Sequence, residues 1–299
     1  MPNTAALRSV RQQSFDDGAS HVALERRAAA LPELHLVEEL LGRSAEAGPL
    51  AGYSVGDTQA LMHVARWSKD FLTQPHPELG RSGHVCPYVS ASIREQRFLL
   101  SVLHGAESQP RETDRTILRL GQYFSTLEPT AGRSAQKKTI VILFPDLPQR
   151  QTGDIINGMH QRLKPHFLRA GMMLGEFYRG SSKPGLHNDQ FRPLRSDVPL
   201  LVIRAMLPGD IAFLSDQARF VRPYIRNFEA RGCAEIRSYL EQQGASLCDA
   251  QRAMLLQQVA AYEASVGGGG RARDTHYPPA FESQVRPAVR LGAAVPRFR

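Results

Sequence analysis

Cysteine is scarce in this sequence. The chain of 299 residues has only 3 cysteines, Cys86, Cys233 and Cys248, and they form no C-x-x-C pair. This number and spacing exclude a disulfide-stapled scaffold and a zinc ribbon. The N-terminal segment also lacks the apolar core of a secretory leader. We therefore expect a cytoplasmic protein whose thiols are free.

Long hydrophobic runs and the common catalytic motifs are missing as well. No stretch approaches the ~18 consecutive apolar residues of a transmembrane helix, so we expect no membrane partner. The sequence has no Gly-rich phosphate loop, no G-x-S-x-G elbow and no H-E-x-x-H helix. These absences argue against ATP-dependent, α/β-hydrolase and zincin chemistry.

Lysine is rare, and arginine supplies most of the positive charge. The chain has 37 basic and 29 acidic residues, which gives a formal net charge of +8. Nucleic-acid-binding proteins usually gather basic side chains on one stripe or patch. Here the arginines are spread along the whole chain, which argues against a nucleic-acid partner. Arginine is also suited to bidentate capture of carboxylate or phosphate groups.

The apolar residues, 42% of the chain, are enough for a substantial core. Continuous apolar runs predict strands over residues 98–103, 139–144, 172–178 and 198–206. Apolar residues at helical spacing predict helices over residues 34–41, 57–71, 112–128, 155–170, 216–230 and 233–265, with Pro165 kinking or splitting the fourth. This pattern indicates an α+β fold, a compact mixed or antiparallel sheet with helices packed on it, plus N- and C-terminal helices.

The predicted domain organisation centres on one core. It comprises an N-terminal arm and helix (1–50), a core α+β domain (51–232), C-terminal helices (233–266) and a disordered Arg- and Pro-rich tail (267–299).

The first candidate site is the segment from Gly83 to Tyr88. If this segment is extended, His84, Cys86 and Tyr88 lie on one side, because alternate residues of a strand share a face. A thiolate beside an imidazole is suited to nucleophilic chemistry or to metal ligation. The alternative is that Cys86 is a small buried hydrophobic residue, as free cysteines usually are. Cys233 and Cys248 are expected to be structural.

The second candidate site is the loop from Pro184 to Ser196. Long loops within a compact domain are often functional. Arg192 and Arg195 are suited to holding a carboxylate, and His187 to acting as a base or as an axial metal ligand. The alternative is that the loop forms a simple turn with both arginines in solvent.

Arg204 lies within the apolar strand predicted over 198–206, where a charge must be paired or must face a ligand. Its best partner from sequence is Glu176 in the preceding apolar strand, so the structural interpretation is an ion pair across neighbouring strands. His160 and His166 flank Pro165 and are expected to be structural. His63 and His104 are isolated and carry no signal.

Several segments occur together in a recognisable order. They are HPELGRSGHVCPYV, ILFPDL, MMLGEF and PGLHNDQFRPLRSDVPLLVIR, which span roughly residues 70–225. This combination resembles a bacterial domain family of no settled activity whose members occur near natural-product biosynthetic genes. It is more distantly similar to the YqcI/YcgG group, which includes haem-dependent N-oxygenases acting on guanidino or amino substrates.

The resemblance implies a haem cofactor. Haem needs an axial His or Cys ligand, an apolar slot and cationic partners for its propionates. The candidate iron ligands are His187 and Cys86, and the candidate propionate partners are Arg192, Arg195 and Arg204. His84, Cys86 and His187 are the candidate catalytic residues. The implied activity is that of an N-oxygenase-like oxidoreductase in secondary-metabolite biosynthesis, acting on a small carboxylate-bearing amine.

Two other functions remain open. One is a haem-free enzyme with Cys86 as nucleophile and His84 or His187 as base. The other is a non-catalytic protein that binds an acidic ligand or a partner, with a homodimer or a pathway protein as candidate partners. The catalytic interpretations require residues 84–88 and 185–204 to meet around one cavity.

Overall fold

The computed structural model describes residues 31–44, 47–243 and 247–267, so the predicted arm at 1–30 and tail at 268–299 lie outside it. Its strands are β1 (His35–Leu36), β2 (Phe98–Val102), β3 (Thr139–Leu143), β4 (Met172–Phe177) and β5 (Leu200–Ala205). Its α-helices are α2 (Val37–Leu41), α3 (Val55–Trp67), α4 (Val89–Arg94), α5 (Pro110–Thr126), α6 (Gly132–Ala135), α7 (Thr152–Arg169), α8 (Ala218–Gln243) and α9 (Asp249–Gly267). Short helical segments are the π-helix η1 (Ser68–Leu72) and the 3-10 helices η2 (Pro77–Leu79) and η3 (Pro208–Phe213).

The described strands form one mixed sheet in the order β1-β2-β3-β5-β4. β2 and β3 are parallel, and every other neighbouring pair is antiparallel. The four strands predicted from apolar runs are present within about two residues of their expected ends. The predicted α+β class is therefore confirmed. β1 was not predicted, because two residues are too few to show a periodicity.

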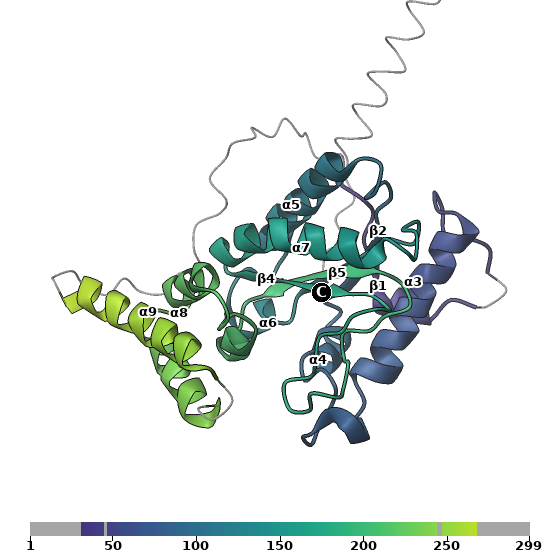
Figure 1. Ribbon diagram of the computed structural model, residues 1–299. Helices are drawn as coiled ribbons and strands as arrows, with labels where there is room; N and C mark the ends of the chain where they lie inside the picture. The colour runs from purple at the N-terminus through teal and green to yellow at the C-terminus, as the bar shows by residue number, and fades with distance from the viewer. Residues whose placement is uncertain (1–30, 45–46, 244–246, 268–299) are drawn as a thin grey trace, which may run out of the picture.

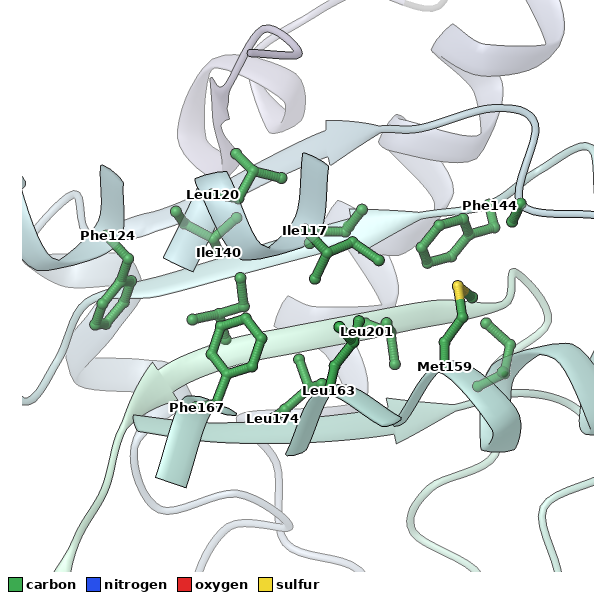
Figure 2. Close-up of a cluster of buried hydrophobic side chains, with 14 of the residues drawn as sticks. Ile117, Leu120, Phe124, Ile140, Phe144, Met159, Leu163, Phe167, Leu174 and Leu201 are labelled. Atoms are coloured by element: carbon green, nitrogen blue, oxygen red, sulfur yellow. The ribbon is translucent and has the colours of Figure 1, made fainter. Parts of the chain in front are cut away.

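Helices α5 and α7 cover one face of the sheet (Figure 1). Figure 2 shows their apolar side chains packed against those of β3, β4 and β5. Ile117, Phe124 and Phe167 have no exposed surface. A Cβ added at Gly121 of α5 would lie 2.6 Å from Cε1 of Phe167, so the two helices meet as closely as a glycine allows. We call this side the covered face.

The opposite side of the sheet is unevenly covered. Helices α2 and α3 pack on the part formed by β2 and β3, and Val37, Leu61 and Leu100 are buried there. Over β4 and β5 the same side keeps Gly175, Phe177, Val202 and Arg204 partly exposed. We call this region the open face, and it is where the chemistry-bearing residues lie.

A third apolar cluster joins β4 to the C-terminal helices, which extend away from the sheet in Figure 1. α8 has a kink at Glu229, where φ is 52°. The break predicted at 231–232 is therefore a kink within α8, and the next helix begins at Asp249. α7 continues through Pro165, so the predicted split is absent and the helix runs to Arg169. No helix in the described ranges is long and apolar enough to cross a membrane.

Candidate functional site

Cys86 is positioned by a short hairpin, residues 72–86. Its two arms are joined by hydrogen bonds from Cys86 N to Leu72 O (2.9 Å) and from Val85 N to Gln74 O (2.8 Å), and by a bridge between Pro75 and His84. Cys86 packs at the rim of the apolar cluster under α3 and is partly buried. His84 is exposed, and its Nδ1 lies 3.0 Å from Ser90 Oγ. The Cys86 thiol therefore packs against apolar side chains, whereas the His84 imidazole contacts Ser90.

Arg204 forms the strongest charge pair on the open face. Its Nη1 and Nη2 donate to the two carboxylate oxygens of Asp210 in η3 at 2.7 and 2.6 Å. Leu207 N also donates to Asp210 at 2.7 Å, and the Asp210 side chain is only 4% exposed. This bidentate geometry fixes the guanidinium at the end of β5.

The predicted ion pair between Glu176 and Arg204 is wrong, and strand register gives the reason. Arg204 lies opposite Met173, whereas Glu176 lies opposite Leu201. Because side chains alternate along a strand, Glu176 faces the covered side and Arg204 faces the open side. An apolar pattern identifies both strands but does not fix their register.

Cys86 and Tyr88 lie within electrostatic range of this pair. Burial works against the charge of Arg204, but Asp210, with smaller contributions from Cys86 and Tyr88, raises the pKa of the guanidinium above its usual value. Desolvation, with a contribution from Asp210, raises the pKa of the Tyr88 phenol. Tyr88 therefore stays protonated at neutral pH and can donate a hydrogen bond. We call Cys86, Tyr88, Arg204 and Asp210 the Cys86 cluster.

Aromatic side chains continue from the open face to the hairpin. Trp67 packs edge-on against Phe177 and stacks with Phe71, with centroid distances of 5.9 Å in both cases. Phe71 approaches Phe191 at 6.4 Å, and Phe191 stacks on His76 at 4.7 Å. We call these five side chains the aromatic row. They give the open face partly exposed apolar surface next to Cys86.

The loop between β4 and β5 places its predicted residues apart from the Cys86 cluster. His187 is exposed. Arg192 donates to the backbone carbonyls of Asp189 and Phe191, and Arg195 Nε donates to Ser181 O at 3.2 Å. Both arginines thus stabilise the loop itself.

The two predicted stretches nevertheless lie side by side. Asn188 Nδ2 donates to Glu78 O at 2.8 Å, and a Cβ added at Gly80 would collide with the carbonyl of His187. Cys86 and Tyr88 approach Arg204 at the same time. The hairpin that carries Cys86 therefore lies against the loop, through Glu78 and Gly80.

A shared cavity between these stretches is not among the best-formed depressions of the described residues. One depression of about 310 Å³ lies at the start of α5 and α7 and is lined by Glu107, Asp154 and Arg162 among others. A second, of about 380 Å³, lies beside it along the first turns of α5. Neither of these two depressions is lined by a residue of the Cys86 cluster.

Sequence reasoning missed the environment of His104. Its Nε2 lies 3.1 Å from Asp57 Oδ1, and its Nδ1 lies 3.5 Å from Asp146 Oδ2. Asp57 also completes the capping box of α3: its carboxylate accepts from Ser54 N and Oγ, and its backbone N donates to Ser54 Oγ. Burial opposes the charge of Asp57, but the bonds from Ser54 together with His104 lower its pKa overall. The interpretation of His104 as isolated was wrong, because its partners come from two distant segments.

A second missed group lies under the covered face. Glu176 is 4% exposed and pairs with Lys183 and with His160, whose Nε2 is 3.0 Å from Glu176 Oε2. His160 Nε2 also lies 2.9 Å from Leu174 O. These contacts agree with the structural role expected for His160.

The described ranges contain no group of three or more His, Cys, Asp or Glu side chains arranged to hold a metal ion. Cys86, Cys233 and Cys248 form no disulfide, as expected.

Comparison with known proteins assigns the chain to a family. A family model described as "Domain of unknown function (DUF6875)" matches residues 61–239, more than half of the chain, so the protein belongs to this family. The match begins in α3 and ends in α8, and it includes the whole Cys86 cluster and the loop between β4 and β5. Neither the curated proteins nor the solved structures that were compared gave a match.

Proposed function

We propose that the protein is a haem-dependent oxidoreductase that holds haem at Cys86 on the open face of the sheet. The observation that carries this proposal is the location of Cys86: a partly exposed thiol beside a fixed arginine and a row of aromatic side chains. A haem site needs the same three elements: an axial ligand, a cation and apolar surface. We include in this proposal a distant relationship to the YqcI/YcgG N-oxygenases.

Part of the expected ligand set fits this site and part does not. Cys86 would hold the iron. Arg204 would lie near the bound group, with both of its Nη atoms bonded to Asp210 and Nη1 also to Ala205 O. Arg192 and Arg195 are engaged with backbone carbonyls, and His187 is exposed on the loop, so the proposal no longer relies on them. When bound, haem supplies the activation of dioxygen or peroxide.

The chain's own residues would orient the ligand and the substrate. Asp210 holds the guanidinium of Arg204 in place through two hydrogen bonds. The Tyr88 phenol is protonated at neutral pH and offers a donor for a substrate oxygen. A cation and a neutral donor next to apolar rings suit a small amine that carries a carboxylate, and we propose this substrate class in a biosynthetic, cytoplasmic setting.

An absorption titration with haem tests the proposal. The wild-type protein is expected to develop a Soret band with one equivalent of haem, and Cys86→Ser is expected to lose or shift it. Cys248→Ser is the matched control, because Cys248 is exposed at the start of α9, outside the Cys86 cluster. Quenching of Trp67, the single tryptophan of the chain, reports the same binding independently.

The outcomes separate the alternatives. A wild-type protein without a Soret band overturns the haem proposal and favours a non-catalytic binding protein. Equal spectra for wild type and Cys86→Ser would instead move the iron ligand to another residue. A haem-free enzyme with Cys86 as nucleophile is less supported, since within the described residues no histidine is hydrogen-bonded to the Cys86 thiol and His84 contacts Ser90.

A further inference from the structure

Residues 185–192, which we call the strap, form a self-contained unit. Gly185 N donates to Phe191 O at 2.8 Å, and Phe191 N donates to Asn188 O at 3.2 Å. Gln190 N is bound by the side chain of Asn188 at 2.9 Å. Because these hydrogen bonds are satisfied within the segment, the strap can move as a rigid body without breaking them.

The base of the strap is firmly attached to the sheet. Lys183 pairs with the buried carboxylate of Glu176, and Arg195 Nε binds Ser181 O. Arg179 and Asp197 pair across the same base at 2.9 Å. Releasing Lys183 would leave the buried negative charge of Glu176 without this cationic partner, and an unpaired buried charge is destabilising. Motion is therefore expected beyond the base rather than at it.

The tip of the strap is held more lightly, by the hairpin and by Phe71 of η1. Its contacts with the hairpin are the hydrogen bond from Asn188 to Glu78 O, the stacking of Phe191 on His76, and the close approach of His187 to Gly80. The hydrogen bond is exposed, and Leu186 is 49% exposed. By contrast, Phe191 is only 5% exposed and covers the outer end of the aromatic row.

We propose that the strap is a hinged lid that closes Phe191 onto the hairpin and controls access to the open face. In the closed arrangement Phe191 lies against His76 and Phe71, at the end of the aromatic row. Lifting the strap uncovers Phe71 and His76 and lengthens the apolar surface beside Cys86. The lid motion itself is independent of haem, whereas its role in admitting a cofactor rests on the proposed function.

Gly80 offers a sharp test. It has φ of 76°, and a Cβ there would collide with the His187 carbonyl, so Gly80→Ala prevents the tip from seating. Gly52 has φ of 79° and nothing within 4 Å of an added Cβ. Gly52→Ala is the matched control, because both substitutions carry a similar backbone cost and only one blocks the strap.

A reporter at the strap measures closure without haem. In a Trp67→Phe/Phe191→Trp background, the fluorescence of the single tryptophan at position 191 reports how far that side chain is buried. Adding Gly80→Ala is expected to shift its emission to the red and to raise its acrylamide quenching about two-fold, while adding Gly52→Ala leaves both unchanged. Equal emission and quenching in the two variants would overturn the lid.

Haem uptake then tests the gating role in the otherwise native chain. With Gly80→Ala, we expect both association and dissociation of haem to be faster than in the Gly52→Ala control. Phe191→Ala, which retains Gly80, should act in the same direction. If the tryptophan at position 191 responds to Gly80→Ala but the protein binds no haem, the lid proposal stands and the haem proposal is overturned. If haem binds with identical rates in all variants, the lid does not control access of haem.

Discussion

The two sides of the sheet differ in what holds them together. On the covered face, helices α5 and α7 bury a continuous apolar cluster in which Ile117, Phe124 and Phe167 have no exposed surface. On the open face, partly exposed rings and a charged pair lie over β4 and β5. The first side is built by packing, which stabilises the fold. The second leaves polar groups and apolar surface accessible to a ligand. This difference between the two faces places the candidate site on the open face.

The largest expected difference concerns one phenylalanine on each side. Phe167→Ala should lower the free energy of unfolding by about 3–5 kcal/mol, because it leaves a cavity in a closely packed core. Phe177→Ala should cost about 1–2 kcal/mol, since part of that ring already faces water. Chemical denaturation measures both. Equal losses would remove the distinction between the two faces.

The next prediction compares a buried carboxylate with an exposed one. Asp210→Ala should cost about 3 kcal/mol, because it leaves the guanidinium of Arg204 without its partner. Asp197→Ala should cost at most about 1 kcal/mol, since Asp197 is 56% exposed in its pair with Arg179. In the double variant Arg204→Met/Asp210→Ala we expect part of the loss to be recovered. A double variant less stable than Asp210→Ala would contradict this explanation.

A pH effect is expected at the edge of the covered face. Lys138 donates to Phe124 O and Leu127 O at the end of α5, and burial lowers its pKa from 10.5 to about 8. Between these values the unfolded chain binds a proton that the folded chain has released, so stability rises with pH.

Relative to Lys138→Met, the wild type should therefore gain about 2 kcal/mol in free energy of unfolding between pH 8 and pH 10.5. Denaturation curves at a series of pH values measure this gain. The control is Lys69→Met, which replaces an exposed lysine and should run parallel to the wild type. A gain that also appears with Lys138→Met would assign the effect to other groups.

The smallest expected effects are two glycine substitutions in the helices of the covered face that should change the free energy of unfolding in opposite directions. Gly121→Ala should destabilise the protein by about 1–2 kcal/mol, although alanine favours helix, because its Cβ would meet the ring of Phe167. Gly158→Ala in α7 should stabilise it by about 0.5–1 kcal/mol, since its Cβ would meet only the flexible end of Arg162. Denaturation midpoints that move in the same direction would show that helix packing does not decide the outcome.

Much of the fold was predictable because hydrophobic burial leaves a local pattern. Thr139–Leu143 is a continuous run in which the first four residues are β-branched, and it lies in the interior of the sheet as such a run predicts. β1 was missed because its pairing with β2 depends on residues more than sixty positions away. The continuity of α7 through Pro165 is likewise decided by packing on β4 and β5 rather than by local propensity.

The candidate site was predictable only in part. Cys86 and Arg204 were singled out as a thiol beside a proline and as a charge in an apolar strand, and they lie within electrostatic range of each other. Their partners were not predictable. Asp210 was missed because a turn after β5 folds back onto Arg204, and the role of His104 because Asp57 and Asp146 reach it from separate segments. Such pairings depend on register and turn geometry, which single residues do not reveal.

The order of the strands sets a condition on biosynthesis of the protein. Of the strands in the described ranges, β5 is translated last, yet it lies between β3 and β4. Until Ala205 has left the ribosome, β3 has an unpaired edge and β4 has no neighbouring strand. The nascent chain therefore exposes backbone N–H and C=O groups that can pair with other chains. Fragments that end before β5 should therefore aggregate rather than fold, and slow translation across residues 178–199 would prolong that exposure.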